Sequence, residues 1–309
     1  MIDKLEYLIA LSRERHFGRA AEACGVTQPT LSAGIKQLED VLGVLLVQRG
    51  SRFVGLTPEG ERTLDWARRI VADTRAMRQD IETLKRGLSG PVRIAAIPSA
   101  LPMVAALTSP FRARYPDVRF TVISRNSEEI LTDLENLTID AGLTYLDNEP
   151  LGRVNTVPLY HERYRLIVRD TLLPEAATRI SWKDVASLPL ALLTPDMQNR
   201  RIVDGVLSTV GQRAAPMLES NSMIALLSHV RSGLWASVMP AMLAEALGAL
   251  DGVRAIPIME PELSHSIGLV APYREPSSPI TTALISEARR IAPTLQDGIL
   301  PHLDLAATQ

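Results

Sequence analysis

The chain of 309 residues is long enough for two or three domains, and its 46% hydrophobic and 22% charged residues are typical of a soluble globular protein. No uncharged apolar run approaches the roughly 18 residues of a membrane-spanning helix, and the N-terminal apolar stretch is short and interrupted by charges. We therefore expect no membrane partner, no signal peptide and a cytoplasmic location. The formal net charge of −2 argues at first against a nucleic-acid-binding protein.

Cysteine and histidine usage predicts neither a disulfide nor a metal site. Cys24 is the only cysteine, so no disulfide can form within the chain; we interpret its thiol as a core group, with a redox sensor as the alternative. The histidines lie far apart, outside metal-ligand spacings such as HExxH: they are His16, His161, His229, His265 and His302. We expect no metal and no cofactor.

The segment from Phe17 to Leu42 indicates two short helices joined by a tight turn, preceded by a scaffold helix from Leu5 to about Arg13. Small alanines let the first of the two helices pack closely, and Gly25 supplies the left-handed residue that ends it. Thr27 is the expected N-cap of the second helix, with a proline in its first turn. An apolar stripe at helical spacing is formed by Leu31, Ile35, Leu38 and Leu42.

The opposite face of this second helix is polar, with Gln28, Thr30, Ser32 and Lys36. Such a helix can enter the major groove of DNA, where Gln pairs with adenine and Ser or Thr with several base edges. An ordinary helical hairpin is the alternative. The next residues predict two strands, Leu45–Gln48 and Phe53–Leu56, with a turn from Arg49 to Arg52 between them.

Charge is distributed unevenly. Residues 1–90 hold 14 Lys and Arg against 12 Asp and Glu, a net of +2, which leaves −4 for the remainder. Binding to DNA therefore depends on where individual cations lie, with Arg19, Lys36, Arg49 and Arg52 as expected phosphate contacts. The predicted DNA-binding residues are Arg19, Thr27, Gln28, Thr30, Ser32, Lys36, Arg49 and Arg52.

Residues 1 to about 90 resemble the winged helix-turn-helix of the LysR-type bacterial transcriptional regulators. The resemblance is carried by Phe17, Ala20, Ala21, Val26–Ser32, Ile35, Leu38, Glu39, Leu42, Gly43, Leu46, Arg49 and Leu56–Gly60. The chain departs from the family at Ala33 and Gly34, where longer polar side chains are common, so the family's contacts there are not expected. We assign residues 1–60 to this DNA-binding domain.

A long helix is predicted from Pro58 to Leu88, opened by the cap residue Thr57. Apolar or small residues recur every seven positions in two series: Ala67, Thr74, Ile81 and Leu88, and Ile70, Met77 and Leu84. This narrow seam favours pairing with a second copy, and a helix lying on its own domain is the alternative. The resemblance implies a linker and dimerisation helix over 58–90, with Ile70, Thr74, Met77, Ile81 and Leu84 at the contact.

Beyond Ser89–Pro91 the pattern alternates between strands and helices, which favours parallel sheet covered by helices. A first set comprises strands 92–97, 118–124 and 139–144 with helices 101–115 and 127–137, and 159–169 indicates one strand turning into another. A second set comprises strands 190–193, 217–219 and 236–239 with helices 199–210 and 222–230. A strand near His265 and a closing helix at 280–291 follow.

These two sets predict subdomains I (about 91–162 and 266–295) and II (about 163–265) hinged around a cleft. They resemble the periplasmic-binding-protein-like effector domain of LysR-type regulators, most clearly from Glu219 to Pro240. The expected fold is therefore an α/β multidomain protein with a winged helix-turn-helix, a linker helix and an effector domain over 91–309.

Ligands of open α/β sheets bind beyond the carboxyl ends of strands, near helix N-termini. Hydroxyls, an amide and arginines at these places suit a small anion such as a carboxylate. Ser99 and Ser222 are expected to cap helices that point into the cleft, although an ordinary cap is the alternative for each. Arg200 and Arg201, like Arg125, are alternatively surface or interface cations. The predicted effector residues are Ser99, Ala100, Ser124, Arg125, Thr144, Thr194, Asn221 and Ser222.

The sequence thus predicts a transcriptional regulator that binds double-stranded DNA and a small-molecule effector. It forms a homodimer through the linker helix, and the family resemblance implies a homotetramer. A cytosolic solute-binding receptor or an enzyme is the alternative, but the chain lacks a GxSxG elbow, a phosphate loop and a dinucleotide fingerprint, and no catalytic residue is assigned. Residues 137–154 and 192–201 resemble a subgroup of regulators encoded beside formate-dehydrogenase genes.

Overall fold

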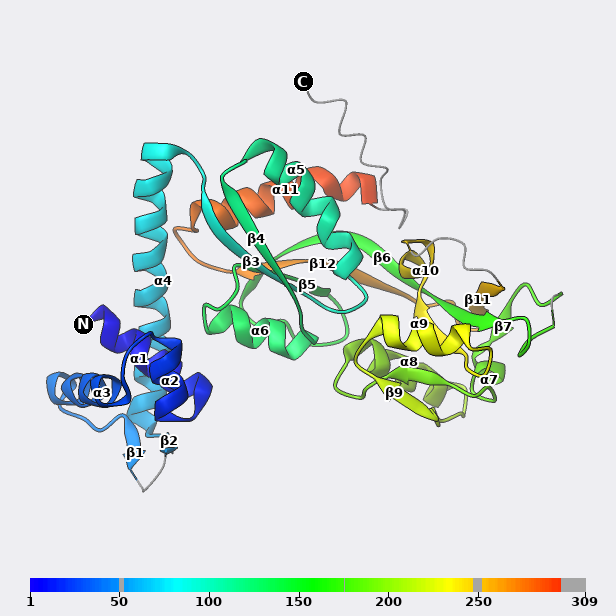
Figure 1. Cartoon of the computed structure of the whole chain (residues 1–309), viewed down its shortest axis with the longest axis horizontal. Helices are drawn as coiled ribbons and strands as arrows, with labels where there is room; N and C mark the ends of the chain where they lie inside the picture. Colours follow the sequence, from blue (N-terminus) through cyan, green and yellow to red (C-terminus); the bar gives the residue numbers. More distant parts are fainter. Residues whose placement is uncertain (50–52, 175, 247–251, 296–309) are drawn as a thin grey trace. The chain divides into compact units, whose positions relative to one another are not determined.

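The computed structural model describes residues 1–49, 53–174, 176–246 and 252–295 (Figure 1). The chain forms two compact units, the first comprising residues 1–88 with the short segments 135–138 and 274–279, the second the remainder. The expected turn residue Arg52 and the tail beyond 295 lie outside the described residues. Within the described residues, no helix combines the length and the apolar character needed to cross a bilayer.

The first unit is a winged helix-turn-helix followed by a long helix, as predicted. Its elements are α1 (Ile2–Glu14), α2 (Phe17–Ala23), α3 (Gln28–Leu42), β1 (Val47–Arg49), β2 (Phe53–Leu56) and α4 (Pro58–Arg86). Thr27 caps α3 as predicted, since its Oγ1 accepts a hydrogen bond from Thr30 N at 3.4 Å. Gly25 adopts the expected left-handed conformation, with φ of 67°.

Leu42 was predicted to be buried and is exposed. It lies in the last turn of α3, beside the C-cap Gly43, and outside the three-helix core that takes up Leu31, Ile35 and Leu38. The buried stripe of α3 therefore ends one turn earlier than its apolar spacing suggested.

The wing is tied to α3 by a buried carboxylate. Glu39 Oε1 accepts hydrogen bonds from Leu46 N at 2.9 Å and Val47 N at 3.3 Å. Because Leu46 N is used in this way and its carbonyl accepts from Thr57 N at 2.9 Å, β1 begins at Val47 instead of the predicted Leu45. Gly60 packs on the same carbonyl, and a Cβ at Gly60 would lie 2.1 Å from Leu46 O.

The first half of α4 lies on its own domain. Leu64, Ala67 and Val71 are buried in the core of the first unit, where α4 packs on α1. The predicted seam that began at Ala67 is therefore wrong at its start, because that residue is already covered within the chain. The apolar positions of the second half, Met77, Ile81 and Leu84, are exposed.

The second unit begins with a parallel group of strands, β3 (Gly90–Ala96), β4 (Val118–Ser124) and β5 (Ala141–Tyr145). Their helices are η1 (Leu101–Met103), α5 (Val104–Arg114) and α6 (Ser127–Glu135), and the closing helix is α11 (Pro279–Leu295). In Figure 1, α5 and α11 lie on one side of these strands and α6 on the other. The predicted parallel pairing is confirmed for β3, β4 and β5. β12 (Ser264–Pro272) pairs antiparallel with β5, so the sheet as a whole is mixed.

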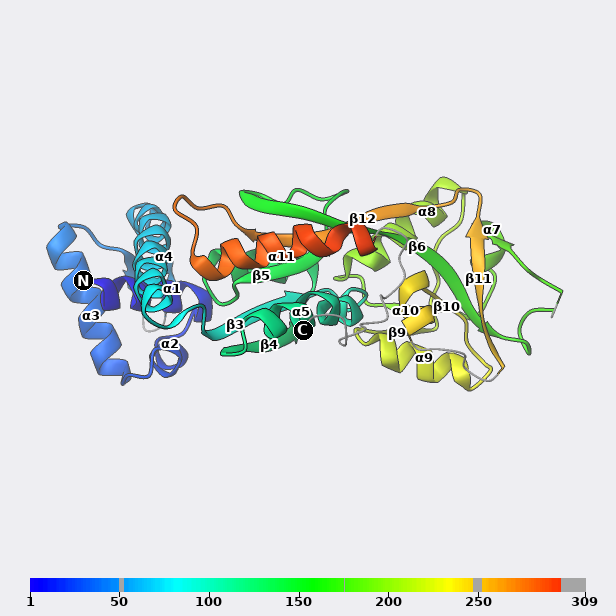
Figure 2. The ribbon, with the colours of Figure 1, turned by 90° about the horizontal axis from the view of Figure 1, so that it is seen from above.

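Segment 154–169 is one continuous strand, β6, and the prediction of a strand turning into another is wrong there. At about 3.3 Å per residue, such a strand spans about 50 Å and serves both subdomains. Its first part pairs with β12, and its second part pairs with β10 (Ser237–Pro240) and β11 (Val253–Met259). Figure 2 shows β6 running along the second unit from one subdomain to the other.

The second subdomain is completed by short elements. They are β7 (Ile180–Ser181), α7 (Trp182–Val185), β8 (Ala191–Leu193), α8 (Gln198–Thr209), β9 (Leu218–Ser220), α9 (Met223–Arg231) and α10 (Ala241–Ala246). The predicted strand-helix alternation from 190 to 239 is reproduced within two residues at each end. β8 and β9 pair in parallel.

Candidate DNA-binding surface and effector cavity

The predicted base-reading residues lie together on the exposed side of α3. Gln28, Thr30, Ser32 and Lys36 are all exposed, and the Thr27 and Thr30 hydroxyls bond to each other at 2.8 Å. This bond and the cap fix the first turn. Gly34 faces the opposite way, because a Cβ there would lie 2.7 Å from a ring carbon of Tyr7 on α1. The departure from the family pattern at Gly34 is thus explained by packing of α1.

Of the four expected phosphate-binding cations, the structure describes the side chains of two, Arg19 and Lys36. Arg19 is exposed on α2, and its guanidinium donates to Glu14 O at 2.7 Å. Lys36 is exposed on α3. Arg49 is the last residue of β1, but its side chain, like the whole of Arg52, lies outside what the structure describes.

The predicted dimerisation residues form an exposed apolar strip on α4, with Ile70, Met77, Ile81 and Leu84. Thr74 is half-buried, and its hydroxyl donates to Ile70 O at 2.8 Å within the helix. Apolar side chains exposed at this regular spacing are unusual on a helix that needs no partner.

The second unit contains a cavity of about 580 Å³ between its two subdomains. Ligand pockets commonly have volumes of about 300–1,000 Å³. The lining residues are Pro98, Leu101, Pro102, Ser124, Arg125, Asn126 and Glu129 from subdomain I, and Asp196, Met197, Asn221, Ser222, Met223, Ile224 and Leu243 from subdomain II. Four predicted effector residues line the cavity: Ser124, Arg125, Asn221 and Ser222. The other four, Ser99, Ala100, Thr144 and Thr194, do not.

Helix N-termini face this cavity from both subdomains. Ser222 caps α9 as predicted, accepting from Ala225 N at 3.3 Å, and the first N–H groups of α9 at Met223 and Ile224 have no partner within the helix. Ser99 was expected to be a cap and is not one, because the chain enters the 3₁₀ helix η1 at Ala100, without a side-chain cap.

Asn126 and Glu129 close the N-terminus of α6 reciprocally. Asn126 Oδ1 accepts from Glu129 N at 2.8 Å, and Glu129 Oε2 accepts from Asn126 N at 2.9 Å. This pairing is a capping box, which satisfies two of the orphan donors at this end within the chain.

The charged side chains of the lining favour negative potential. Arg125 Nε pairs with Asp133 at 3.0 Å, which compensates its charge, whereas Glu129 and Asp196 contribute carboxylates. Hydrogen bonding from the Thr194 hydroxyl and from Asn126 lowers the pKa of Asp196, so this group stays ionised. Among the described lining residues, no cation is left without an acidic partner.

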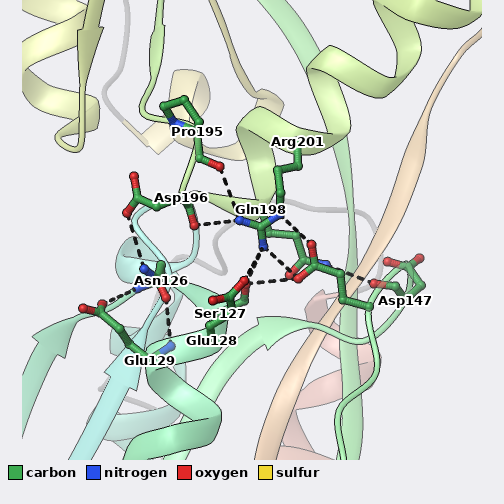
Figure 3. Close-up of polar contacts among 10 residues, drawn as sticks. Asn126, Ser127, Glu128, Glu129, Asp147, Pro195, Asp196, Gln198 and Arg201 are labelled. Atoms are coloured by element: carbon green, nitrogen blue, oxygen red, sulfur yellow. Dashed lines mark hydrogen bonds and ion pairs between the residues drawn. The ribbon is translucent and has the colours of Figure 1, made fainter.

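Polar contacts join the subdomains beside the cavity (Figure 3). Arg201 donates to Glu149 through Nε at 2.7 Å and Nη2 at 2.8 Å, and to Asp196 O at 2.7 Å. Gln198 Nε2 donates to Asp147 O at 3.2 Å. Arg201, left open as a surface or interface cation by the sequence, thus binds across the subdomain boundary.

Arg200, the neighbour of Arg201, serves its own subdomain instead. Its guanidinium bonds to Asp204 at 2.9 Å, to Glu219 at 2.5 Å and to Leu193 O at 2.9 Å. Both arginines are therefore paired with acids.

Sequence reasoning missed a buried polar cluster around Glu162 of β6. Tyr145 OH donates to Glu162 Oε1, and Asn199 Nδ2 lies 3.2 Å from Tyr145 OH and 3.5 Å from Glu162 Oε1. Tyr164 OH lies 3.3 Å from Tyr145 OH. Strand alternation carried the signal, because Glu162 shares the inward side of β6 with Tyr160 and Tyr164.

Burial raises the pKa of Glu162 from 4.5 to about 7, although hydrogen bonds from Tyr145, Ser99, Tyr164 and Asn199 oppose the rise. A carboxyl group in this state is divided between its neutral and ionised forms at neutral pH.

The described residues indicate neither a reactive thiol nor a metal site. Burial raises the pKa of the Cys24 thiol, which favours the unreactive form. Across the described ranges of the chain, no cluster of three or more His, Cys, Asp or Glu residues could hold a metal ion.

Two family models match the chain. Residues 2–61 match that of the bacterial regulatory helix-turn-helix protein of the lysR family, and residues 85–292 match that of the LysR substrate binding domain. The second match alone covers more than half of the chain.

Similar proteins extend over the whole length. The chain is 28% identical over 304 residues to the hydrogen peroxide-inducible genes activator of Haemophilus influenzae, covering 98% of each chain. It is 29% identical over 309 residues to the DNA-binding transcriptional dual regulator OxyR of Escherichia coli, covering 100% of this chain and 99% of that one.

Solved structures share the fold. A full-length OxyR variant from Pseudomonas aeruginosa matches with a TM-score of 0.72 and 25% identity, covering 95% of this chain and 96% of that one. Full-length CbnR in complex with its target DNA matches with a TM-score of 0.61 and 21% identity, covering 94% and 100% of the two chains. The chain therefore belongs to the LysR family of DNA-binding transcriptional regulators, which carry an effector-binding domain and are not enzymes.

Proposed function

We propose that this regulator binds its operator as a homodimer through the exposed face of α3, and that a small anionic effector in the cavity changes this binding. The observation that carries the proposal is the position of the cavity, which receives lining residues from both subdomains. A ligand there contacts both subdomains and binds their different arrangements unequally, so it shifts the populations of those arrangements. Altered affinity for the operator, or an altered DNA bend, is the expected result.

The first turn of α3 is proposed to read base edges, with Gln28, Thr30 and Ser32 as direct contacts and Thr27 as the cap that positions them. Arg19, Lys36, Arg49 and Arg52 are proposed to contact phosphates. These assignments are supported by the exposure of six of the residues: Arg19, Thr27, Gln28, Thr30, Ser32 and Lys36.

Dimerisation through the exposed strip on α4 doubles the number of DNA contacts. Ile70, Met77, Ile81 and Leu84 supply its apolar surface. Two copies of α3 related by a two-fold axis then meet two half-sites of an inverted repeat. Pairs of such dimers give the homotetramer that the family resemblance implied.

The effector is proposed to place its negative group near the start of α9, where Met223 and Ile224 present free N–H groups and Ser222 holds the turn. Ser124, Arg125 and Asn221 supply further polar contacts, and the apolar walls receive the rest of the molecule. Ser99, Ala100, Thr144 and Thr194 stand outside this lining, so direct contact by them requires a different cleft opening.

A gel shift with DNA upstream of the neighbouring divergent gene, repeated at several salt concentrations, tests the regulator function. A specific regulator keeps its preferred site while nonspecific binding falls away. DNase footprints with and without candidate anions then test the cavity. Ser222→Ala should lose the effector-dependent change, whereas Ser181→Ala, which removes the N-cap of α7 away from the cavity, should keep it. An unchanged response in Ser222→Ala would argue against this site.

Peroxide sensing, which the names of the relatives suggest, is a second candidate. With Cys24 as its only cysteine, this chain cannot form an intrachain disulfide, and that thiol belongs to α2 of the DNA-binding unit. We therefore propose that effector binding, not thiol oxidation, controls operator binding. The wild-type protein and Cys24→Ser should give the same footprints before and after peroxide treatment.

Formate is the finer proposal, drawn from the resemblance of residues 137–154 and 192–201 to regulators beside formate-dehydrogenase genes. Formate is a carboxylate and so falls within the anion class proposed above. Footprints in sodium formate and in equal sodium chloride test it, and identical footprints would remove formate as the effector. We further propose that the protein acts in the cytoplasm, where its operator is.

A further inference from the structure

Glu162 is a fully buried carboxyl group at the place where the two subdomains meet. It lies in β6, the strand that both subdomains share. Its oxygen Oε1 accepts a hydrogen bond from Tyr145 OH of β5 in subdomain I, and Asn199 Nδ2 of α8 in subdomain II lies 3.5 Å from the same oxygen. Glu162 therefore makes polar contacts on both sides of the subdomain boundary.

The surroundings of Glu162 offer hydrogen bonds but no positive charge. The side chains that donate to it are all neutral: Tyr145, Ser99, Tyr164 and Asn199. Arg200 and Arg201, which follow Asn199 in α8, form their ion pairs with other acids. A buried carboxylate without a cation is costly in free energy, and the protonated, neutral carboxyl group avoids this cost. Burial accordingly raises the pKa of Glu162 from 4.5 to about 7, although the four hydrogen bonds oppose the rise.

Subdomain II covers Glu162 through the first turn of α8. Asn199 lies in that turn and is 5% exposed, and its Nδ2 is also 3.2 Å from Tyr145 OH. Met197, the N-cap of α8, lines the cavity between the subdomains. A movement of α8 away from β5 therefore takes Asn199 off Glu162 and brings water from the cavity to the carboxyl group. Once it is solvated, the pKa of Glu162 returns toward its ordinary value of 4.5.

We propose that Glu162 makes the closure of the two subdomains proton-dependent. The closed arrangement keeps a proton on Glu162, and release of that proton to solvent favours an open arrangement in which α8 leaves the carboxylate to water. In the closed form the proton resides on Oε2, so Oε1 still accepts from Tyr145 and Asn199. Solution pH then becomes a second input to operator binding beside the effector, and only this last step rests on the regulation proposed above.

The direction of the pH effect follows from the two pKa values of Glu162, about 7 when closed and 4.5 when solvated. Between these values the closed arrangement binds more protons than the open one, so closure is favoured at low pH and is weakened as pH rises. The ratio of open to closed molecules should rise about thirtyfold between pH 5.5 and 8.5 and level off near pH ~8.

The other titratable groups around Glu162 must be separated from it. Burial raises the pKa of each surrounding tyrosine, so three of them stay neutral throughout this range: Tyr145, Tyr160 and Tyr164. His265 of β12 is the paired neighbour of Glu162, packs edge-on against two of these rings, and places Nδ1 3.4 Å from Asp147 Oδ1. His161 precedes Glu162 in β6 and is exposed on the opposite side of the strand. Histidines commonly change charge between pH 5 and 8, so a variant at His265 accompanies the test.

Time-resolved fluorescence energy transfer in the full-length protein measures the closure. Cys24→Ser removes the only cysteine, and Thr132→Cys on α6 with Ser208→Cys on α8 then places one dye on each subdomain at exposed positions. An excess of unlabelled chain keeps each pair of dyes within one protomer. From pH 5.5 to 8.5 a second distance population should replace the first. Glu162→Gln cannot ionise, so it should keep the low-pH distances at every pH.

Two further variants separate this role from a structural one. Tyr145→Phe removes a hydrogen bond that lowers the pKa of Glu162, so the population ratio should go on rising to higher pH before it levels off. His265→Asn should respond as the wild type does. Wild-type distances that do not change over this pH range would overturn the inference, as would a response that persists in Glu162→Gln and disappears in His265→Asn.

Operator footprints at the same pH values distinguish a failure of this inference from a failure of the proposed function. A pH-dependent distance ratio that is lost in Glu162→Gln supports the proton linkage even where no anion changes the footprint. Footprints that change with carboxylates while the distances stay independent of pH leave the effector cavity in place and overturn this inference alone.

Discussion

Leu84→Ser should weaken the homodimer more than any other single change on the exposed strip. Leu84 is 85% exposed in the single chain, against 56% for Met77 and 45% for Ile81. Full burial of a leucine is worth about 1.5–3 kcal/mol, so covering this exposed fraction contributes about 1.3–2.5 kcal/mol per protomer and about 2.5–5 kcal/mol per dimer. Each 1.4 kcal/mol is about tenfold in Kd, so the variant should dissociate at a concentration about 60- to 4,000-fold higher.

Sedimentation equilibrium of the full-length protein over a range of concentrations measures this change. Met217→Ser is a suitable control, because Met217 is 74% exposed but belongs to the second unit and is no part of α4. A Leu84→Ser protein with the wild-type dimer affinity would refute the assignment of the strip, as would equal weakening by Met217→Ser. Circular dichroism should show unchanged helix content, since Leu84 buries little of its surface within the chain.

Three further changes test other parts of the account. Gln28→Ala should leave folding intact but relax the choice of operator base by about 1–3 kcal/mol, measured by competition gel shifts with single-base operator variants; unchanged discrimination would remove Gln28 from base reading. Gly60→Ala should destabilise the first unit by about 1–3 kcal/mol or more, because the new Cβ would lie 2.1 Å from Leu46 O. A free energy of unfolding in urea equal to that of the wild type would contradict this packing. The folded-state pKa of Glu162, about 7, lies above its ordinary value of 4.5, so its contribution to stability is fully present below about pH 4.5 and is lost as pH rises to about 7, at a total of about 3 kcal/mol. Glu162→Gln should remove that loss of stability. If the free energies of unfolding of the two proteins instead fall in parallel between pH 4.5 and about 7, Glu162 is not the titrating group.

Local sequence signals predicted the first unit well because short-range rules determine it. Thr27 caps α3 and Gly25 ends the preceding turn, and both roles depend only on neighbouring residues. The predictions for the first unit were wrong where tertiary packing decides whether an apolar residue is buried. Leu42 continues the apolar spacing of α3 but has no core to enter, and Ala67 continues the heptad of α4 but is already covered within its own domain.

Long-range pairing limited the prediction of the second unit. Strand positions were recognisable, but the antiparallel insertion of β12 between β5 and β6 depends on a segment more than a hundred residues away in sequence. The cavity was predicted in part, through loops that end strands, and Ser222 keeps its predicted cap. Glu162 was missed because a charged residue in a strand ordinarily indicates solvent, and only the fold brings Tyr145 and Asn199 to it.

Selection of binding sites from a random double-stranded DNA library by the full-length protein tests the central claim most directly. Recognition by two copies of α3 predicts an enriched inverted repeat, with half-sites separated by about one helical turn of roughly 10 base pairs or a multiple of it. The Leu84→Ser protein should enrich the same half-site with weaker selection for the repeat. Enriched sequences without two-fold symmetry, or no enrichment over the starting library, would contradict the account.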